Sequence, residues 1–232
     1  MREEVARMLR SLDPSLIGNF ETQNDRTEHN LRLEDFVVPA LSLLPSKKSK
    51  ARNGVGEKAQ LTLSDFVAND EEFLDKFDLF LIEVILPWLK EKMISDGLFM
   101  EDSQISFYYQ RPPTLRIQPG PSTRGVQPHS DATYGHQDGE LNFWMPLTDP
   151  NLTLTDLWAE SEPGKEDYQA LGPKLGEVVS FHGSSCKHYV PPNLSSNTRV
   201  SIDFRVGIEG YFDPHWKMRG TKSDHTRRTV RL

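Results

Sequence analysis

The sequence predicts a mainly β fold with α-helical additions, and three observations support that class. After residue 100, seven short segments are rich in aromatic and β-branched residues, at 105–109, 114–117, 140–147, 156–160, 177–181, 187–190 and 198–206. Pro, Gly, Asn and Asp separate these segments, as is typical of residues between strands. Before residue 100, apolar residues recur at helical spacing instead. So many short strands predict a sandwich or a barrel.

The N-terminal part is predicted to be mostly helical. Residues 3–12 carry apolar side chains at positions 5, 8, 9 and 12, which is a helical spacing. Residues 31–44 mix acidic and apolar residues and are expected to be partly helical. Residues 46–60 are polar, basic and glycine-containing, so we expect an exposed loop there. Ser64 and Asp65 offer an N-cap for the helical region that follows.

Residues 71–95 give the strongest helix signal in the chain. This run is apolar on most faces around residues 79–89, so we expect it to be buried against a sheet. Pro87 should kink or restart the helix, because it lacks a backbone N–H. Phe77, Phe80 and Trp88 are expected in the core rather than at a cofactor.

Length and composition favour a single domain spanning residues 1–232. Within it we expect a helical portion at 1–100 that packs on a β core at 101–212, followed by a basic tail at 213–232. The single cysteine, Cys186, excludes intramolecular disulfides and fits a reducing compartment. The longest apolar run, at 79–89, is too short to span a bilayer, and no signal-peptide pattern is recognisable. We therefore expect a soluble, cytoplasmic protein that does not interact with membranes.

Charge is unevenly distributed along the chain. The net charge is −7, but residues 215–232 carry +5, which leaves −12 for the rest. An acidic body argues against bulk nucleic-acid binding. The tail could attract an anionic substrate or partner, although a solvated, partly mobile terminus is the simpler interpretation. The oligomeric state cannot be predicted from these patterns.

His129 and Asp131 are the first candidates for a functional site. They stand two residues apart, and residues at i and i+2 of an extended strand point to the same side. Nitrogen and oxygen ligands that converge in this way suit a divalent first-row metal. A buried His–Asp hydrogen bond without metal is the alternative. His182 and His188 are the candidates for a third ligand, and Cys186 is expected to be an inert small residue rather than a thiolate ligand.

Arg199 and Ser201 favour His188 as that third ligand. Arg199 follows His188 by eleven residues and shares a strand face with Ser201. A rigid guanidinium fork beside a hydroxyl is suited to binding a carboxylate. Alternatively, Arg199 pairs with Asp203 for a structural reason, and Ser201 is an ordinary strand residue.

Together these residues resemble a known family. His129-x-Asp131, then His188 after 57 residues, then Arg199-x-Ser201, is a pattern similar to that of the Fe(II)/2-oxoglutarate-dependent dioxygenases. The segments PTLRIQP, YGHQDGELNFWMPLTD, LWAESEPGKEDY and RVSIDFRV also resemble the small-molecule branches of that superfamily. These branches include phytanoyl-CoA-hydroxylase-like and antibiotic-biosynthesis-type enzymes. The resemblance covers about residues 105–210.

The resemblance implies a fold, a reaction and cofactors. The fold would be a double-stranded β-helix, or jelly-roll, of cupin type, with N-terminal helices against it. The reaction would couple oxidative decarboxylation of 2-oxoglutarate, giving succinate and CO2, to C–H oxidation of a small metabolite by O2. Hydroxylation, desaturation and cyclisation all stay open. The substrate is expected to be a free small molecule, for which an anionic or amino-acid-like end is one possibility.

The resemblance also assigns roles to individual residues. His129, Asp131 and His188 would be the catalytic Fe(II) ligands. Arg199 and Ser201 would bind the far carboxylate of 2-oxoglutarate, with Asn142 and Trp144 as further cosubstrate contacts. Substrate contacts are expected at four positions, which are Arg116, Tyr134, His136 and Glu160.

Two other functions stay open at this point. One is a cupin-type metalloenzyme that does not use 2-oxoglutarate, in which Arg199 would be structural. The other is a non-catalytic jelly-roll binding module that uses the basic tail and the loop at 47–58 for a partner. Buried polar ligands cost stability, which argues against the binding module.

Overall fold

The computed structural model describes residues 1–12, 33–35, 67–216 and 227–232. The predicted loop at 46–60, the predicted N-cap at Ser64 and Asp65, and His225 lie outside these residues. The same holds for the expected helix at 31–44, apart from a 3-10 turn, η2 (Leu33–Asp35).

Two antiparallel sheets form the body of the protein. Along the larger sheet the order is β10 (Arg227–Arg231), β1 (Ser106–Gln110), β9 (Arg199–Ile208), β4 (Glu140–Pro146) and β7 (Val179–Phe181), and β2 (Thr114–Gln118) also pairs with β9. Along the smaller sheet it is β3 (Val126–His129), β8 (His188–Val190), β5 (Trp158–Ala159) and β6 (Gln169–Ala170). The prediction of a mainly β protein is confirmed. Each of the seven predicted segments contains a strand, whereas β6 and β10 were not predicted.

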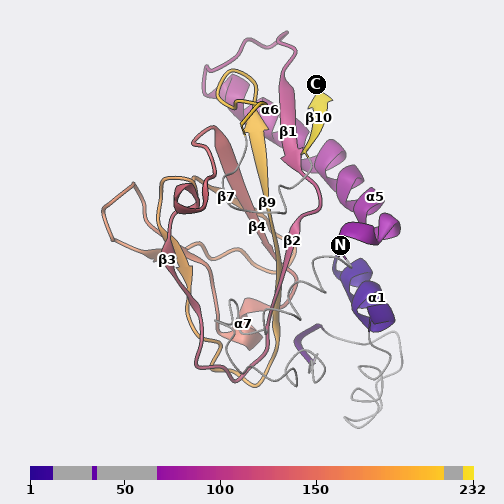
Figure 1. The fold of residues 1–232 in the computed structure, drawn as a ribbon, viewed down its shortest axis with the longest axis vertical. Helices are drawn as coiled ribbons and strands as arrows, with labels where there is room; N and C mark the ends of the chain where they lie inside the picture. Colours follow the sequence, from indigo (N-terminus) through magenta and orange to yellow (C-terminus); the bar gives the residue numbers. More distant parts are fainter. Residues whose placement is uncertain (13–32, 36–66, 217–226) are drawn as a thin grey trace.

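Helices cover one face of the larger sheet. They are α1 (Arg2–Leu12), α5 (Glu71–Phe80), the π-helical stretch η4 (Leu81–Ile85) and α6 (Leu86–Ser95). Figure 1 shows α1 and α5 on one side of the larger sheet and β3 on the other. Asp70 caps α5 by accepting a hydrogen bond from the backbone N–H of Phe73 at 3.0 Å. Pro87 lies in the first turn of α6, where its missing N–H has no cost, so the predicted restart is confirmed.

The helical run packs against the larger sheet, as expected, and it buries a single face. Phe73, Leu74, Phe77, Leu81, Ile85, Leu86, Leu89 and Met93 are buried. In contrast, Leu79 and Val84 are each 52% exposed and Trp88 is 45% exposed. A helix that packs on the outer face of a sheet buries only one stripe of its own surface, even when the residues on its other faces are apolar. Trp88 therefore lies at the rim of the core, edge-on to Phe143 with 6.2 Å between ring centroids.

Strand β9 separates the hydrophobic core from a polar interior. Val200, Ile202, Phe204 and Val206 are buried, and Phe204 stacks on Phe143 with 5.2 Å between centroids. Because side chains alternate along a strand, Arg199, Ser201, Asp203 and Arg205 share the other face of β9. Three of these four line a pocket that also includes residues of the smaller sheet. The polar row therefore lies between the two sheets.

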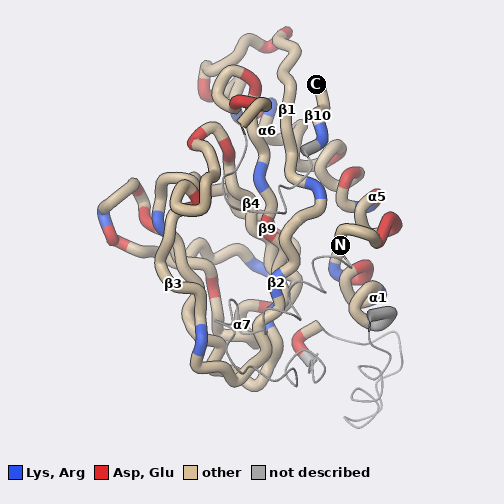
Figure 2. The backbone as a smooth tube through the Cα atoms, in the orientation of Figure 1, with Lys and Arg blue, Asp and Glu red and all other residues tan. Residues whose placement is uncertain are grey.

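The C-terminal residues are not simply a solvated tail, as the sequence had suggested. Residues 227–231 form β10, an edge strand that pairs with β1 from Ser106↔Arg231 to Gln110↔Arg227. The side chains of Arg228 and Arg231 remain exposed, so the basic charge of this segment is at the surface. Figure 2 shows this basic edge beside α5, along which acidic residues gather.

Two short elements complete the described structure. The turn η5 (Asp131–Tyr134) follows β3, and α7 (Pro150–Thr153) follows β4. Helix α1 is tied to η2 because Arg2 donates to both carboxylate oxygens of Glu34, at 2.9 and 2.7 Å. None of the described helices is long and apolar enough to cross a membrane.

Candidate active site

The loop after β3 brings His129, Asp131 and His188 together. His129 ends β3 and is paired in register with His188 on β8. Asp131 opens the 3-10 turn η5, so the strand ends earlier than the sequence pattern had implied. Ser130 between them is still extended, with φ −103° and ψ 148°. One ligand atom from each of the three residues lies within 4.8 Å of the others, so this group could hold a metal ion.

Backbone carbonyls orient both imidazoles. Nδ1 of His129 lies 2.7 Å from the carbonyl oxygen of Gln127, and Nδ1 of His188 lies 3.2 Å from that of Cys186. A carbonyl can only accept, so each Nδ1 carries the proton and each Nε2 is left with its lone pair. Burial lowers the pKa of His188, although Asp131 opposes that shift. Two imidazoles whose Nε2 atoms face a carboxylate suit a divalent metal.

The carboxylate of Asp131 stays ionised although it is buried. Burial alone would raise its pKa, but Arg205, His188 and Asn142 outweigh burial and hold the pKa well below the ordinary value. Arg205 donates to Oδ2 through Nε at 3.0 Å and through Nη2 at 2.7 Å. The amide of Asn142 donates to the same oxygen at 2.7 Å. Asn142, expected as a cosubstrate contact, therefore contacts a proposed metal ligand through its amide nitrogen.

His182 lies outside the cluster, as the spacing to Arg199 predicts. Its Nε2 is 2.9 Å from the carbonyl oxygen of Asp138, and its Nδ1 is 2.6 Å from the hydroxyl of Ser185. Cys186 is buried, which raises the pKa of its thiol, and it is not among the grouped ligands. The geometry thus favours His188 as the third ligand.

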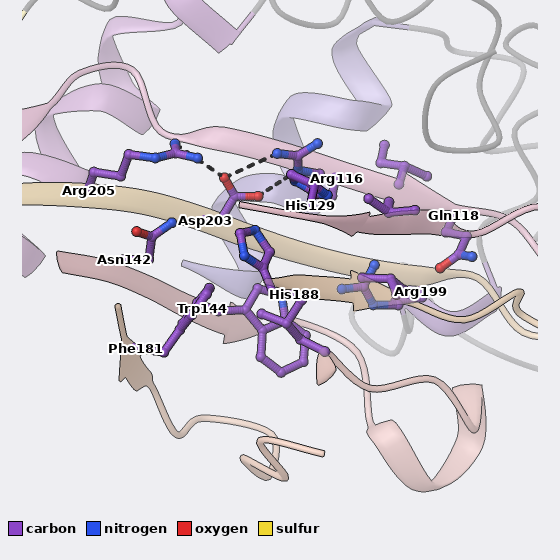
Figure 3. A pocket seen from close by; sticks show the side chains of 14 residues that line it. Arg116, Gln118, His129, Asn142, Trp144, Phe181, His188, Arg199, Asp203 and Arg205 are labelled. Atoms are coloured by element: carbon purple, nitrogen blue, oxygen red, sulfur yellow. Dashed lines mark hydrogen bonds and ion pairs between the residues drawn. The ribbon is translucent and has the colours of Figure 1, made fainter. Parts of the chain in front are cut away.

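A pocket between the two sheets adjoins the metal-ligand cluster. His129, His188 and Val190 line it from the smaller sheet, and Asn142 and Trp144 line it from β4. Figure 3 shows Arg116, Arg199, Asp203 and Arg205 around the same pocket. The two histidines of the cluster and these charged side chains therefore line one pocket.

Arg199 is buried in this pocket without a counterion. It is 4% exposed and forms no ion pair with any residue that the structure describes. Its guanidinium carbon lies 5.3 Å from the centroid of the Trp144 ring. Burial, and secondarily the nearby Arg116, lower the pKa of Arg199 to about 10. Arg116 takes the carboxylate that could have paired with Arg199, because its Nε lies 2.6 Å from Oδ2 of Asp203.

Unsatisfied polar atoms are concentrated at this pocket. Within the described residues, the buried side-chain atoms without a hydrogen-bond partner are Gln118 Oε1, Asn142 Oδ1, Trp144 Nε1, Arg199 Nε and Ser201 Oγ. All but Ser201 belong to residues that line the pocket, and Ser201 lies between Arg199 and Asp203 on β9. Buried polar groups without partners cost stability, so their collection in one place indicates a polar ligand.

The four expected substrate contacts take different places. Tyr134 is 41% exposed and lies edge-on to His129, with 5.3 Å between ring centroids. Arg116 lines the pocket but is paired with Asp203. His136 is bonded to Glu140 at 2.8 Å, and Glu160 accepts hydrogen bonds from the backbone N–H groups of residues 164, 166 and 187. The described lining of the pocket includes neither His136 nor Glu160, and both have structural partners.

Three residues at this site were not predicted, namely Arg205, Asp203 as the partner of Arg116, and Gln110 behind Arg205. The alternation of β9 contained the signal, because residues 199, 201, 203 and 205 must share one face. The contact of Arg205 with Asp131 joins residues 74 positions apart, which no local pattern reveals.

Comparison with known proteins gives distant relatives. No protein-family profile matches the chain. The streptomycin biosynthesis protein StrG of Streptomyces griseus is 33% identical over 114 residues, which are 49% of this chain and 53% of StrG. The chain thus spans about half the length of this curated relative.

Among solved structures, the nickel complex of the non-haem monooxygenase ThoJ matches with a TM-score of 0.37 and 18% identity, over 51% of this chain and 58% of ThoJ. The non-haem α-ketoglutarate-dependent epimerase SnoN, from nogalamycin biosynthesis, matches with a TM-score of 0.35 and 14% identity, over 43% and 47% of the two chains. A Pseudomonas putida prolyl-4-hydroxylase matches with a TM-score of 0.34 and 15% identity, over 59% and 64%. Non-haem enzymes are therefore among the structural neighbours. TM-scores of this size decide neither fold nor function, which must be inferred from the site.

Proposed function

We propose that this protein is a non-haem Fe(II)/2-oxoglutarate-dependent oxygenase acting on a small molecule, and that its two sheets form a double-stranded β-helix. The supporting observation is that His129 and His188 of the metal-ligand cluster line one pocket with Arg199, a buried cation with no counterion among the described residues. Such a pocket suits a cosubstrate that chelates a metal at one end and carries a carboxylate at the other. 2-Oxoglutarate has these two ends.

The donor set fits Fe(II). Two imidazole nitrogens and one carboxylate oxygen form the 2-His-1-carboxylate set typical of non-haem Fe(II) oxygenases, with positions left open for exchangeable ligands. His129, Asp131 and His188 would hold the ion. When bound, Fe(II) would supply the activation of O2 that couples decarboxylation of 2-oxoglutarate to C–H oxidation.

The far carboxylate of 2-oxoglutarate would bind Arg199. This pairing would offset the cost of burying an unpaired guanidinium. The indole N–H of Trp144 and the hydroxyl of Ser201 are free to donate to the same ligand. The amide oxygens of Gln118 and Asn142 also lack partners among the described residues, but they can only accept. Both amide nitrogens already donate, that of Gln118 to the carbonyls of Arg124 and Pro191 and that of Asn142 to Asp131. Arg116 and Asp203 neutralise each other, so they leave Arg199 as the anchor for the anion.

The substrate would approach from the side of the cluster that is open to solvent. His129 is 20% exposed there and Tyr134 lies beside it, which makes Tyr134 a proposed substrate contact. The similarity to a streptomycin biosynthesis protein supports a small metabolite as substrate. An anionic or amino-acid-like end, the choice among hydroxylation, desaturation and cyclisation, and a cytoplasmic location stay predictions.

Succinate release tests the proposal. Purified protein with Fe(II), O2 and 2-oxoglutarate should release succinate slowly alone and faster with a true substrate. His129→Ala and Arg199→Ala should abolish this release, whereas His182→Ala, which alters a histidine outside the cluster, should retain it. Protein that binds neither Fe(II) nor 2-oxoglutarate would contradict the proposal.

Binding and turnover measurements on the same purified protein distinguish the two alternative functions from the proposed one. A cupin-type enzyme without 2-oxoglutarate would show no thermal stabilisation by 2-oxoglutarate and would keep Arg199 for structure. The lack of a partner for Arg199 among the described residues argues against that role. A binding module would bind metal without any turnover of 2-oxoglutarate.

A further inference from the structure

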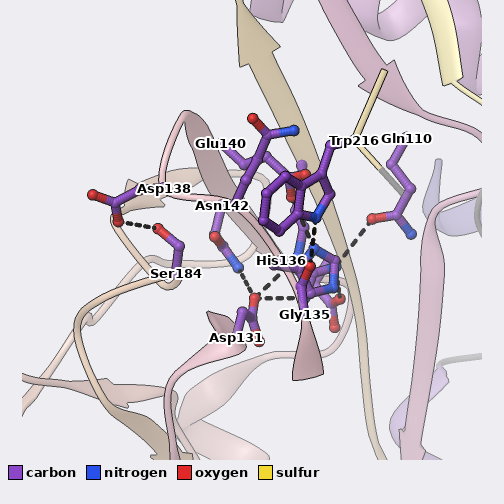
Figure 4. A network of polar contacts seen from close by, with 12 residues as sticks. Gln110, Asp131, Gly135, His136, Asp138, Glu140, Asn142, Ser184 and Trp216 are labelled. Carbon is purple, nitrogen blue, oxygen red and sulfur yellow. Dashed lines mark hydrogen bonds and ion pairs between the residues drawn. The ribbon is translucent and has the colours of Figure 1, made fainter. Parts of the chain in front are cut away.

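The two oxygens of Asp131 have different surroundings. Oδ2 accepts three hydrogen bonds, two from Arg205 and one from Asn142, at 3.0, 2.7 and 2.7 Å. Oδ1 instead lies 3.8 Å from Nε2 of His129 and 3.6 Å from Nε2 of His188. Figure 4 shows the amide of Asn142 bonded to Asp131 on the side where these donors gather. One oxygen is therefore saturated with donors, and the other faces the imidazoles.

Arg205 is itself held in a fixed orientation. Its Nη1 donates to Oε1 of Gln110 at 3.0 Å. The amide nitrogen of Gln110 is in turn fixed by the carbonyl of Pro112 at 3.1 Å and the hydroxyl of Thr114 at 3.2 Å. Arg205 is only 8% exposed, so no solvent shell competes for its guanidinium. Rotating the carboxylate of Asp131 would break its bonds to this fork.

We propose that Arg205 is a positioning residue that restricts Asp131 to one metal-binding oxygen. A carboxylate that chelated the ion with both oxygens would occupy one more coordination position. Two-point binding of 2-oxoglutarate together with O2 needs three positions besides the protein ligands, so a chelating Asp131 would remove one of them. This inference rests on the proposed metal site and gives a role to the ion pair between Arg205 and Asp131 at the edge of the pocket.

Packing alone gives no reason for this arrangement. A buried ion pair can often be replaced as a whole by apolar residues without loss of stability, so stability alone explains neither Arg205 nor Asp131. The three donors converge on the oxygen that points away from both imidazoles. This geometry is what a one-oxygen ligand requires, and a merely structural pair would have no need of it.

Ni(II) titration calorimetry provides the first test, with Ni(II) alone as the probe. Arg205→Met should bind Ni(II) about 10- to 100-fold more weakly than the wild type, as is usual when the partner of a metal ligand is removed. Arg205→Lys keeps the charge but lacks the planar fork, so it should also lose about tenfold. Arg111→Met is the matched control, because Arg111 pairs with Asp78 at 3.0 Å outside the pocket, and its Ni(II) affinity should be unchanged.

Crystal structures of the Ni(II) complexes provide the second test. In the wild type, Asp131 should bind Ni(II) through one oxygen while Arg205 stays on the other; in Arg205→Met, both oxygens should bind. Chelation by both oxygens in the wild type, or wild-type affinity in Arg205→Lys, would overturn the inference. If Arg205→Met does not fold, Gln110→Leu, which removes the acceptor for Arg205 but leaves Arg205 and Asp131 in place, should still weaken Ni(II) binding, and unchanged affinity would count against the inference. Failure of the wild type itself to bind Ni(II) would instead refute the proposed function.

Discussion

Arg116 and Asp203 pair across β2 and β9, with 2.6 Å between Nε and Oδ2. This pair occupies Asp203, one of the carboxylates that raise the pKa of Arg199, and leaves Arg199 as a buried cation whose Nε has no partner among the described residues. A protein that only needed a stable core would gain from an apolar residue at this position. The Arg116–Asp203 pair therefore reserves Arg199 for a ligand, and the following predictions depend on that arrangement.

Arg199→Met should stabilise the ligand-free protein and weaken the binding of 2-oxoglutarate. Removing a buried, unpaired charge should raise the free energy of unfolding by about 1 kcal/mol. Losing the charged hydrogen bonds to a carboxylate should weaken 2-oxoglutarate binding by about 100-fold. Urea unfolding gives the stability, and thermal shift with 2-oxoglutarate gives the binding.

Arg116→Met is the matched control for this change. It leaves Asp203 without its hydrogen-bonded counterion and with only the more distant Arg205 at 3.9 Å, so we expect it to destabilise the ligand-free protein. If Arg199→Met were destabilising and still bound 2-oxoglutarate, Arg199 would have a structural role instead.

Metal binding should depend on His188 and not on His182. His188→Ala removes one of three grouped ligands, so Ni(II) affinity should fall by at least about 100-fold. His182→Ala should leave the affinity unchanged, because both of its ring nitrogens are bonded outside the cluster. Equal losses in the two variants, measured by calorimetry, would contradict the choice of His188.

Trp144→Phe separates ligand binding from packing. The ring of Trp144 is buried, but its Nε1 has no partner within the described residues, so phenylalanine removes an unused donor. The cosubstrate should lose one hydrogen bond, worth about 1 kcal/mol or roughly fivefold in the 2-oxoglutarate dissociation constant. A calorimetric titration that found wild-type affinity would remove Trp144 from the proposed cosubstrate site.

Glu34 should contribute a pH-dependent part of the stability. Burial would raise its pKa, but hydrogen bonds from Arg2 and from the backbone N–H of Asp149 lower it below the ordinary 4.5. A lowered carboxyl pKa means that the stabilisation is present above about pH 4.5 and is lost as the pH falls through the folded-state value. Glu34→Gln should be less stable by about 2 kcal/mol at pH 7 and should lack this acid-dependent loss. Urea unfolding of the wild type and of Glu34→Gln from pH 7 to 3 checks the stability difference and its pH dependence. Identical pH profiles of the two proteins would disprove the role of Glu34.

Local patterns predicted much of the β architecture and the composition of the site. Alternation and turn residues located the strands that carry His188 and Arg199, and the spacing of these residues with His129 and Asp131 indicated one centre. The same patterns failed where the outcome depended on distant pairing. Strand β10 exists because Arg227–Arg231 finds the edge of β1, and its arginine-rich sequence gives little strand signal.

The sequence also failed to predict which helical side chains are exposed and which polar side chains far apart in the chain are in contact. Trp88 lies on an apolar helix, but only the sheet decides which stripe of that helix is covered. Arg116 was expected at the mouth of the site, and its partner Asp203 became evident only once β2 was placed in register with β9. Arg205 donates to Asp131, which lies in the turn η5 after β3, and a strand prediction cannot place that turn.

The central claim is that a metal and 2-oxoglutarate occupy one pocket. Calorimetric titration of 2-oxoglutarate into metal-free and Ni(II)-loaded protein tests this claim most directly. We expect the Ni(II)-loaded protein to bind 2-oxoglutarate at least about tenfold more tightly than the metal-free protein, since chelation adds to the contact with Arg199. This gain should disappear in His188→Ala, whereas Arg199→Met should weaken the binding of 2-oxoglutarate both with and without Ni(II). Equal affinity with and without Ni(II), or no binding of 2-oxoglutarate at all, would contradict the claim.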